Sequence, residues 1–99
     1  MVARSVDRDQ RAVEATNVFR VGETAYVSVE FLNVQSGSNL GIAWFREGEE
    51  FSTYDTGPLS GFPRAYLAFF NDLRAAGAYT ADILVNGSVV ARASFIAEE

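Results

Sequence analysis

The stretch that decides the fold is residues 77–95, which read GAYTADILVNGSVVARASF. On both sides of Asn86-Gly87 the side chains alternate between apolar and more polar types, which is the period of a half-buried strand. Asn-Gly is the strongest short hairpin signal, because both central residues of a type I′ turn need a positive φ. The stretch therefore predicts an antiparallel hairpin with strands at 79–85 and 89–95.

The same alternation extends upstream. It is clearest in Thr24–Val34, and it recurs at 40–45, where Leu40, Ile42 and Trp44 share one face. Weaker strands are predicted at 3–6, 13–19 and 51–54. Turns or loops are expected at 7–10, 35–39, 48–50 and 55–63, the last because of its Gly and Pro residues.

The segment 64–76 fits two structures. Tyr66, Phe69, Phe70 and Leu73 follow helix spacing, with Pro63 as a first helical residue and Gly77 as a stop. Alternatively, 64–70 is a strand that turns at Asn71-Asp72. Local pattern alone slightly favours the helix.

Composition limits the chemistry. The 99 residues are 48% hydrophobic, which predicts one domain over 1–99 with a real core. Cysteine, histidine and lysine are all absent, which excludes disulfides, Cys/His metal sites, Ser-His-Asp triads and Schiff bases. The net charge of −5 argues against a nucleic-acid partner. No stretch approaches the length of a membrane span, and the first ten residues contain no signal-peptide h-region.

One set of spacings resembles the immunoglobulin superfamily. Gly77, Tyr79 and Ala81 match the G-x-Y-x-C motif of strand F, with alanine in place of the cysteine. Trp44 lies where the buried strand-C tryptophan belongs, and Val29 where the first cysteine would be. The resemblance implies an antiparallel β-sandwich of about seven strands, in which the Tyr79 hydroxyl bonds back to the chain.

A closer likeness is to cysteine-free immunoglobulin-like modules of bacterial extracytoplasmic and surface proteins. It is carried by Phe19, by AYVSV at 25–29, by GSNLGIAW at 37–44, and by the run from Ala76 to Phe95. This likeness favours a strand at 64–70. An α+β fold with a short helix at 64–76 remains the alternative.

Carboxylates are the only acid–base groups available near neutral pH. Glu47, Glu49, Glu50 and Asp55 cluster in sequence after Trp44 and could ligate calcium, although no EF-hand pattern is present. A solvated hairpin tip is the simpler and preferred interpretation. A glycosidase-like carboxylate pair has nothing to hold it across a cleft. We therefore expect no enzyme, no metal site and no cofactor.

Aromatic residues offer better candidates for a ligand or interface site. The core would take Phe31, Trp44, Tyr79, Phe95 and one of Phe69 or Phe70, which leaves others to face outward. Exposed aromatic side chains can stack on sugars or anchor a protein partner. The candidates are Phe45, Phe51, Tyr54 and Tyr66. The competing interpretation is that the loop 55–63 folds over the first three as a satellite core.

These observations predict a non-catalytic structural or adhesion-type module of a prokaryotic extracytoplasmic protein. A carbohydrate-binding module is the alternative. We expect a protein or glycan partner, no nucleic acid and no membrane insertion, with self-association through edge strands as a further possibility.

The predicted location is the cell surface or outside, as part of a longer chain, or the cytoplasm if the chain is complete. Asn86-Gly87-Ser88 matches a glycosylation acceptor, but the turn already explains it.

Overall fold

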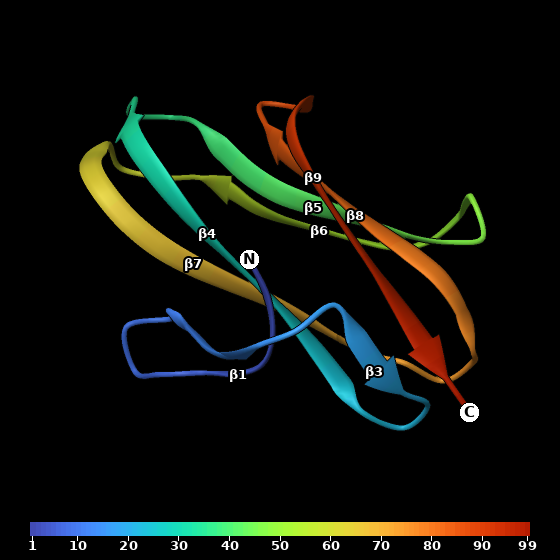
Figure 1. Ribbon diagram of the computed structural model, residues 1–99. Coiled ribbons are helices and arrows are strands. Elements are labelled where there is room, and N and C mark those ends of the chain that lie inside the picture. The colour runs from blue at the N-terminus through green and yellow to red at the C-terminus, as the bar shows by residue number, and fades with distance from the viewer.

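The computed structural model describes residues 1–99 as a sandwich of two β-sheets with no helix (Figure 1). The all-β prediction is confirmed, and the sandwich has nine strands where about seven were expected. In chain order the strands are β1 (Val2–Val6), β2 (Ala12–Ala15), β3 (Val18–Arg20), β4 (Thr24–Val34), β5 (Asn39–Arg46), β6 (Glu49–Pro58), β7 (Phe62–Asp72), β8 (Gly77–Val85) and β9 (Ser88–Glu98).

The first sheet has the strand order β2-β1-β4-β7, and the second has β3-β9-β8-β5-β6. All neighbours are antiparallel except β3 and β9, which run parallel. The hairpin predicted from residues 77–95 is β8–β9, and its turn residues Asn86 and Gly87 have φ of 51° and 83°, as a type I′ turn requires.

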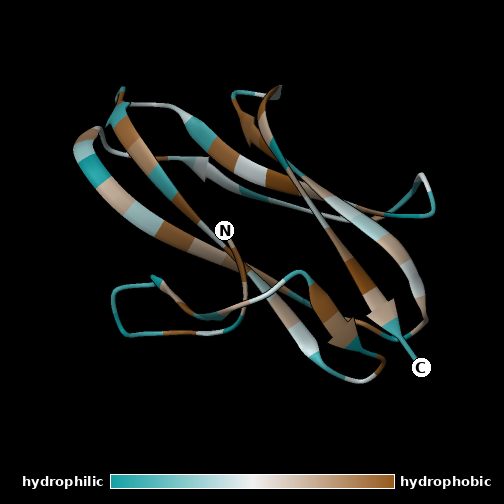
Figure 2. Ribbon diagram, in the orientation of Figure 1, coloured by the Kyte–Doolittle hydropathy of each residue, from teal (hydrophilic) through white to brown (hydrophobic).

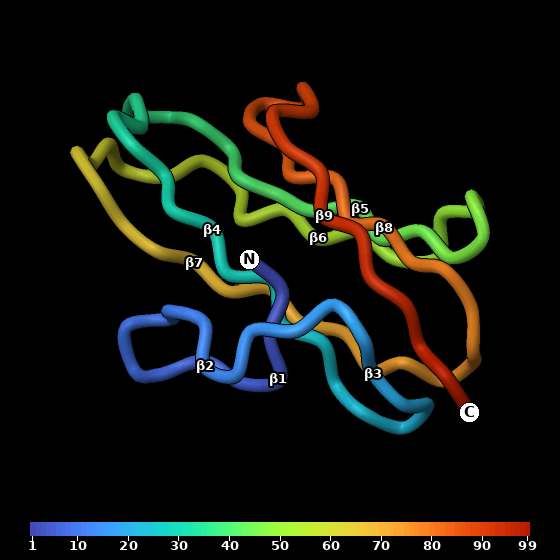
Figure 3. The backbone as a smooth tube through the Cα atoms, viewed as in Figure 1, coloured from blue at the N-terminus to red at the C-terminus, as the bar shows by residue number.

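Two local predictions were wrong. The single segment 13–19 is two strands in different sheets, β2 and β3, between which the chain crosses the sandwich (Figure 3). Much of the predicted loop 55–63 is strand, because β6 stays paired with β5 as far as Pro58. Pro58 is tolerated there because β6 is an edge strand and its last residue needs no ladder donor. The loop is reduced to residues 59–61.

Within the ambiguous segment 64–76, residues 64–72 belong to strand β7, which excludes the helix alternative and places the turn after Asp72 instead of at Asn71-Asp72. Strand β7 pairs with β4 along most of its length, from Thr24↔Asp72 to Val34↔Phe62. This pairing supplies backbone partners that the local pattern of apolar residues could not reveal. It also places Phe69 in the core and leaves Phe70 66% exposed on the opposite face. The banding of apolar and polar residues along β4 and β7 is visible in Figure 2.

The core lies between the two sheets and is centred on aromatic rings. Phe95 stacks on Tyr79 with ring centroids 5.3 Å apart, and it meets Phe19 and Trp44 edge-on at 5.5 and 6.2 Å. Ala81 is fully buried, whereas Val29 is only half-buried at the margin of the core. The chain has no cysteine, so no disulfide joins the sheets at these two positions.

The hydroxyl of Tyr79 closes a local turn. It donates a hydrogen bond of 2.5 Å to the carbonyl of Ala75, four residues upstream, as the resemblance predicted. We expect Tyr79→Phe to lower the free energy of unfolding by about 1 kcal/mol, because one intramolecular hydrogen bond is lost while the ring stays packed. Urea unfolding followed by tryptophan fluorescence measures this. Tyr54→Phe is the control, since Tyr54 is 59% exposed and its hydroxyl forms no hydrogen bond within the chain; equal losses for both variants would contradict the prediction.

Candidate functional site

The two long sides of the sandwich differ. On one side the crossover at Thr16-Asn17 links the sheets, and the amide of Ile96 donates to the carbonyl of Asn17 at 2.9 Å. On the other side the edge strands β6 and β7 face each other without hydrogen bonding as neighbours. The chain connects them through residues 59–61 at one end. We call this second side the open side, and it carries both of the main surface hollows.

The larger hollow lies between the central parts of β6 and β7 and measures about 490 Å³. We call it the edge groove. Its walls are mainly apolar, and its polar residues are Gln10, Ser52, Thr53 and Thr56. The apolar lining is formed by Ile42, Trp44, Tyr54, Leu67, Ala68, Phe69 and Phe70.

Tyr54 is placed in the edge groove by a close approach of two strands. Tyr54 lies opposite Ile42, whose side chain points into the core. At the neighbouring position, a Cβ on Gly41 would lie 2.7 Å from the Tyr54 carbonyl oxygen, so only glycine allows β5 and β6 to come this near. The Tyr54 ring contacts Phe69 at a centroid distance of 6.2 Å, yet the residue is 59% exposed. Tyr54 therefore forms a rim of the groove.

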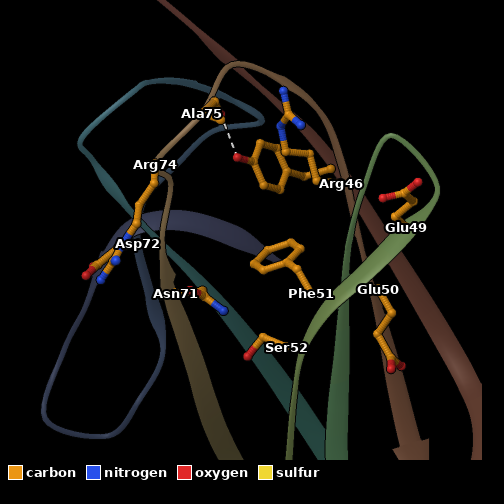
Figure 4. A pocket seen from close by; sticks show the side chains of 10 residues that line it. Arg46, Glu49, Glu50, Phe51, Ser52, Asn71, Asp72, Arg74 and Ala75 are labelled. Atoms are coloured by element: carbon orange, nitrogen blue, oxygen red, sulfur yellow. Dashed lines mark hydrogen bonds between the residues drawn. The ribbon is translucent and has the colours of Figure 1, made fainter.

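The second hollow, the end cavity, lies beyond the groove and measures about 450 Å³. Phe51 stands in its middle, with its ring edge-on to Tyr79 at 5.7 Å. Figure 4 shows Asn71, Asp72 and Arg74 on the side of Phe51 away from Glu49 and Glu50. Ser52 lines both hollows, so the two adjoin along the open side.

The four aromatic candidates do not share one surface. Phe51 and Tyr54 both lie on the open side, in adjoining hollows. Phe45 is half-buried on the outer face of the second sheet, since its neighbour Trp44 points inward. Tyr66 is on the outer face of the first sheet, opposite Glu30. No loop covers Phe51 or Tyr54 as a satellite core, and no flat platform for a sugar unites the four.

Tyr66 lies instead within a small group of charged residues. The guanidinium of Arg11 stacks over its ring at 4.8 Å, and that of Arg64 is 5.9 Å away. Arg64 also forms an ion pair with Glu30. The Tyr66 hydroxyl and the Glu30 carboxylate together raise the pKa of Arg64, because both accept hydrogen bonds from the charged form.

The acidic residues after Trp44 are dispersed. Glu47 accepts a hydrogen bond from the amide of Ala78 at 3.0 Å, and Asp55 accepts one from the amide of Gly57 at 2.7 Å. Glu49 and Glu50 line the end cavity. No group of three or more carboxylates comes close enough together to hold a metal ion. The structure also contains no helix with the length and apolarity needed to cross a membrane.

Sequence reasoning missed two residues of the open side, Phe70 and Gln10. The alternation along β7 could have placed Phe70 outside once Phe69 was inside, but this requires the strand assignment first. Gln10 lies in a predicted turn and reaches β7 from a distant part of the sequence, where its side-chain oxygen accepts a hydrogen bond of 2.7 Å from the amide of Ala68. No local signal marks that contact.

Comparison with known proteins identifies a likeness of fold. No family model matches the chain, and no curated protein does. Among solved structures, the chain is similar to part of the alkylpurine DNA glycosylase AlkC of Pseudomonas fluorescens, in a structure bound to DNA that contains an abasic-site analogue. The sequence identity is 16% and the TM-score is 0.59, over 84% of this chain but only 28% of that one.

This likeness corrects two predictions made from the sequence, that the protein is not an enzyme and that it has no nucleic-acid partner. The neighbour that contains this fold is a DNA glycosylase, and it is bound to DNA. The net charge of −5 is a sum over the whole surface, so it could not exclude a local basic patch such as Arg11 and Arg64 beside Tyr66. At a sequence identity of 16%, this likeness shows a shared fold alone.

Proposed function

We propose that this chain is an immunoglobulin-like interaction module that binds an extended segment of another polypeptide along its open side. The buried Trp44 and the hydrogen bond from Tyr79 to Ala75 support the immunoglobulin-like relationship. The resemblance of the sequence to bacterial surface modules supports a place in the extracytoplasmic part of a prokaryotic protein.

One observation carries the proposal: the edge groove is apolar inside and has exposed aromatic side chains at its rim. Tyr54 and Phe70 are 59% and 66% exposed, and both line the groove. Aromatic residues are enriched at the centres of protein interfaces, where they supply most of the binding energy. A contiguous apolar hollow of this kind is a sign of an interaction surface.

The shape of the groove defines the kind of partner. Its two walls are edge strands, and the edge of each carries backbone groups that no further strand of the chain pairs with. An extended peptide can add main-chain hydrogen bonds to such an edge while alternate side chains enter the hollow. The lining is mainly apolar, so we expect those alternate side chains to be apolar or aromatic.

Selection from a random dodecapeptide display library on the whole chain tests this proposal. We expect enrichment of peptides with alternating apolar residues, and a loss of affinity of about tenfold or more in Tyr54→Glu, because a charge at the rim must be desolvated on binding. Val90→Glu is the matched control, since Val90 is 58% exposed on β9, away from the groove. Failure to enrich any peptide, or equal losses in the two variants, would overturn the proposal.

A DNA probe in the same experiment tests nucleic acid as the alternative class of partner. The probe is a labelled duplex that contains an abasic-site analogue, as in the structure of the neighbouring protein. Binding of this duplex is measured at physiological salt with the wild-type chain and with Arg11→Ala. If the duplex binds and Arg11→Ala removes that binding while peptides fail, the outer face around Tyr66 is the functional surface and the peptide proposal is wrong.

A further inference from the structure

The free edge of β7 is long and mainly apolar. Strand β7 has 11 residues, and Ala65–Phe70 contains no charged residue. The amide of Ala68 donates to Gln10 and so points away from β4, which places the amides and carbonyls of residues 66, 68 and 70 along the free edge. An edge strand with these properties is a template for pairing with another strand.

The sequence of β7 is complementary to itself about Ala68. In an antiparallel pair with a second copy, centred on Ala68, residues equally far from Ala68 face each other. Tyr66 then faces the second copy's Phe70, and Arg64 faces the second copy's Asp72, each twice by symmetry. These are an aromatic pair and an opposite-charge pair, two of the combinations that stabilise cross-strand neighbours. The small Ala68 lies at the centre, where the two copies approach most closely.

Gln10 occupies the place that the second copy would take. Its side-chain oxygen accepts the Ala68 amide at 2.7 Å, where the carbonyl of the incoming Ala68 would lie. Gln10 adopts a φ of 64°, which is uncommon for a non-glycine residue, and its carbonyl accepts the Ser28 hydroxyl at 2.5 Å. The hairpin between β1 and β2 thus holds Gln10 against the β7 edge as a replaceable cap.

We propose that the free edge of β7 pairs with a second copy of this chain, antiparallel and centred on Ala68, and that Gln10 competes with this pairing. The proposal rests on the proposed function, because it names the partner that docks at the same open side. Symmetric pairing of one patch with itself is the commonest way in which protein chains form dimers. The pairing joins the first sheets of the two copies into one continuous sheet.

Disulfide trapping tests the register, because the chain has no cysteine of its own. In a hydrogen-bonded antiparallel pair the two Cα atoms are about 5.5 Å apart, which is within the range of a disulfide. We expect Ala68→Cys to form a covalent dimer under mild oxidation. Ala91→Cys is the matched control, since Ala91 is an exposed alanine on β9. A mixture of Arg64→Cys and Asp72→Cys chains should yield only the mixed dimer.

Absence of the Ala68→Cys dimer in folded protein would overturn the proposal, as would equally fast cross-linking of Ala91→Cys. Exclusive cross-linking of Arg64→Cys to itself would show a different register and would overturn it as well. If trapping fails while peptides still bind in a Tyr54-dependent manner, only the second copy is excluded and the proposed function stands. If trapping and peptide binding both fail, the dimer proposal and the proposed function are both wrong.

The competition by Gln10 is tested with the unmodified chain by sedimentation equilibrium. We expect Gln10→Ala to tighten dimerisation about tenfold, because the symmetric dimer no longer has to displace two side-chain hydrogen bonds. Arg8→Ala, on the same exposed turn, should leave the dimerisation constant unchanged. Weaker or unaltered dimerisation in Gln10→Ala would show that Gln10 does not compete for the edge.

Discussion

Replacing Trp44 with alanine is expected to lower the free energy of unfolding by about 3–5 kcal/mol. Trp44 is 2% exposed, and its indole packs edge-on against Phe95 at a centroid distance of 6.2 Å. Alanine would leave a cavity between the sheets that neighbouring strands cannot fill without moving. For a domain of this size the loss is a large fraction of a total stability of about 5–15 kcal/mol.

Denaturant unfolding monitored by circular dichroism measures this loss, since the variant has no tryptophan. Phe70→Ala is the control: Phe70 is 66% exposed, and we expect a change of about 0.5 kcal/mol or less. Trp44 is the only tryptophan, so the emission of the wild-type protein should be blue-shifted. Emission at the wavelength of a fully hydrated indole would contradict the position of Trp44 in the core.

Phe19→Ala is expected to destabilise the protein by a similar amount, about 3–5 kcal/mol. Its strand, β3, has only three residues, yet the side chain is 0% exposed and meets Phe95 edge-on at 5.5 Å. The ring closes the side of the sandwich where the chain crosses between sheets. A short strand can therefore contribute as much as a long one when its single inward side chain is large.

A second substitution in β3 checks that burial of the Phe19 ring is the cause of the expected destabilisation. Val18→Ala removes a side chain that is 39% exposed, so we expect it to cost less than about 1 kcal/mol. In a double-mutant cycle, Phe19→Ala and Phe95→Ala should show a coupling of about 0.5–1.5 kcal/mol, the contribution of an edge-to-face pair. Additive effects in the cycle, or a small effect of Phe19→Ala alone, would place Phe19 outside the core.

Several elements could be predicted because their signal is local. The Asn86-Gly87 turn needs only two residues that tolerate positive φ, and the alternation on either side extends it into β8 and β9. The alternation in Thr24–Val34 and the shared face of Leu40, Ile42 and Trp44 likewise matched β4 and β5.

Other elements could not be predicted because their partners are distant. The strand at 62–72 has helix spacing of apolar residues, so its local pattern did not predict it; the family resemblance favoured a strand at 64–70, and pairing with β4 stabilises it. The strand character of Asp55–Pro58 depends on β5, whose close approach at Gly41 draws β6 along it despite residues typical of turns. The division of 13–19 into β2 and β3 follows from the closure of one side of the sandwich.

In the candidate site, too, some features could be predicted from local sequence and others depend on distant parts of the chain. Phe51 and Tyr54 were identified by residue type and position in sequence, and both lie on the open side. Phe45 and Tyr66 were equally plausible, but strand parity and the crossing of the chain between the two sheets put them on opposite outer faces. Gln10 reaches Ala68 only because the β1–β2 hairpin folds across the outer face of β4.

The sequence by itself determined the class of fold, the central hairpin and the aromatic core, and it excluded the chemistries that need cysteine, histidine or lysine. Period-two alternation and turn residues act over a few positions, so they are readable without the rest of the chain. The tertiary structure alone decided which side of the sandwich is open, which aromatic side chains meet there, and which strand edge is free. These depend on the pairing of strands far apart in sequence, which no local pattern encodes.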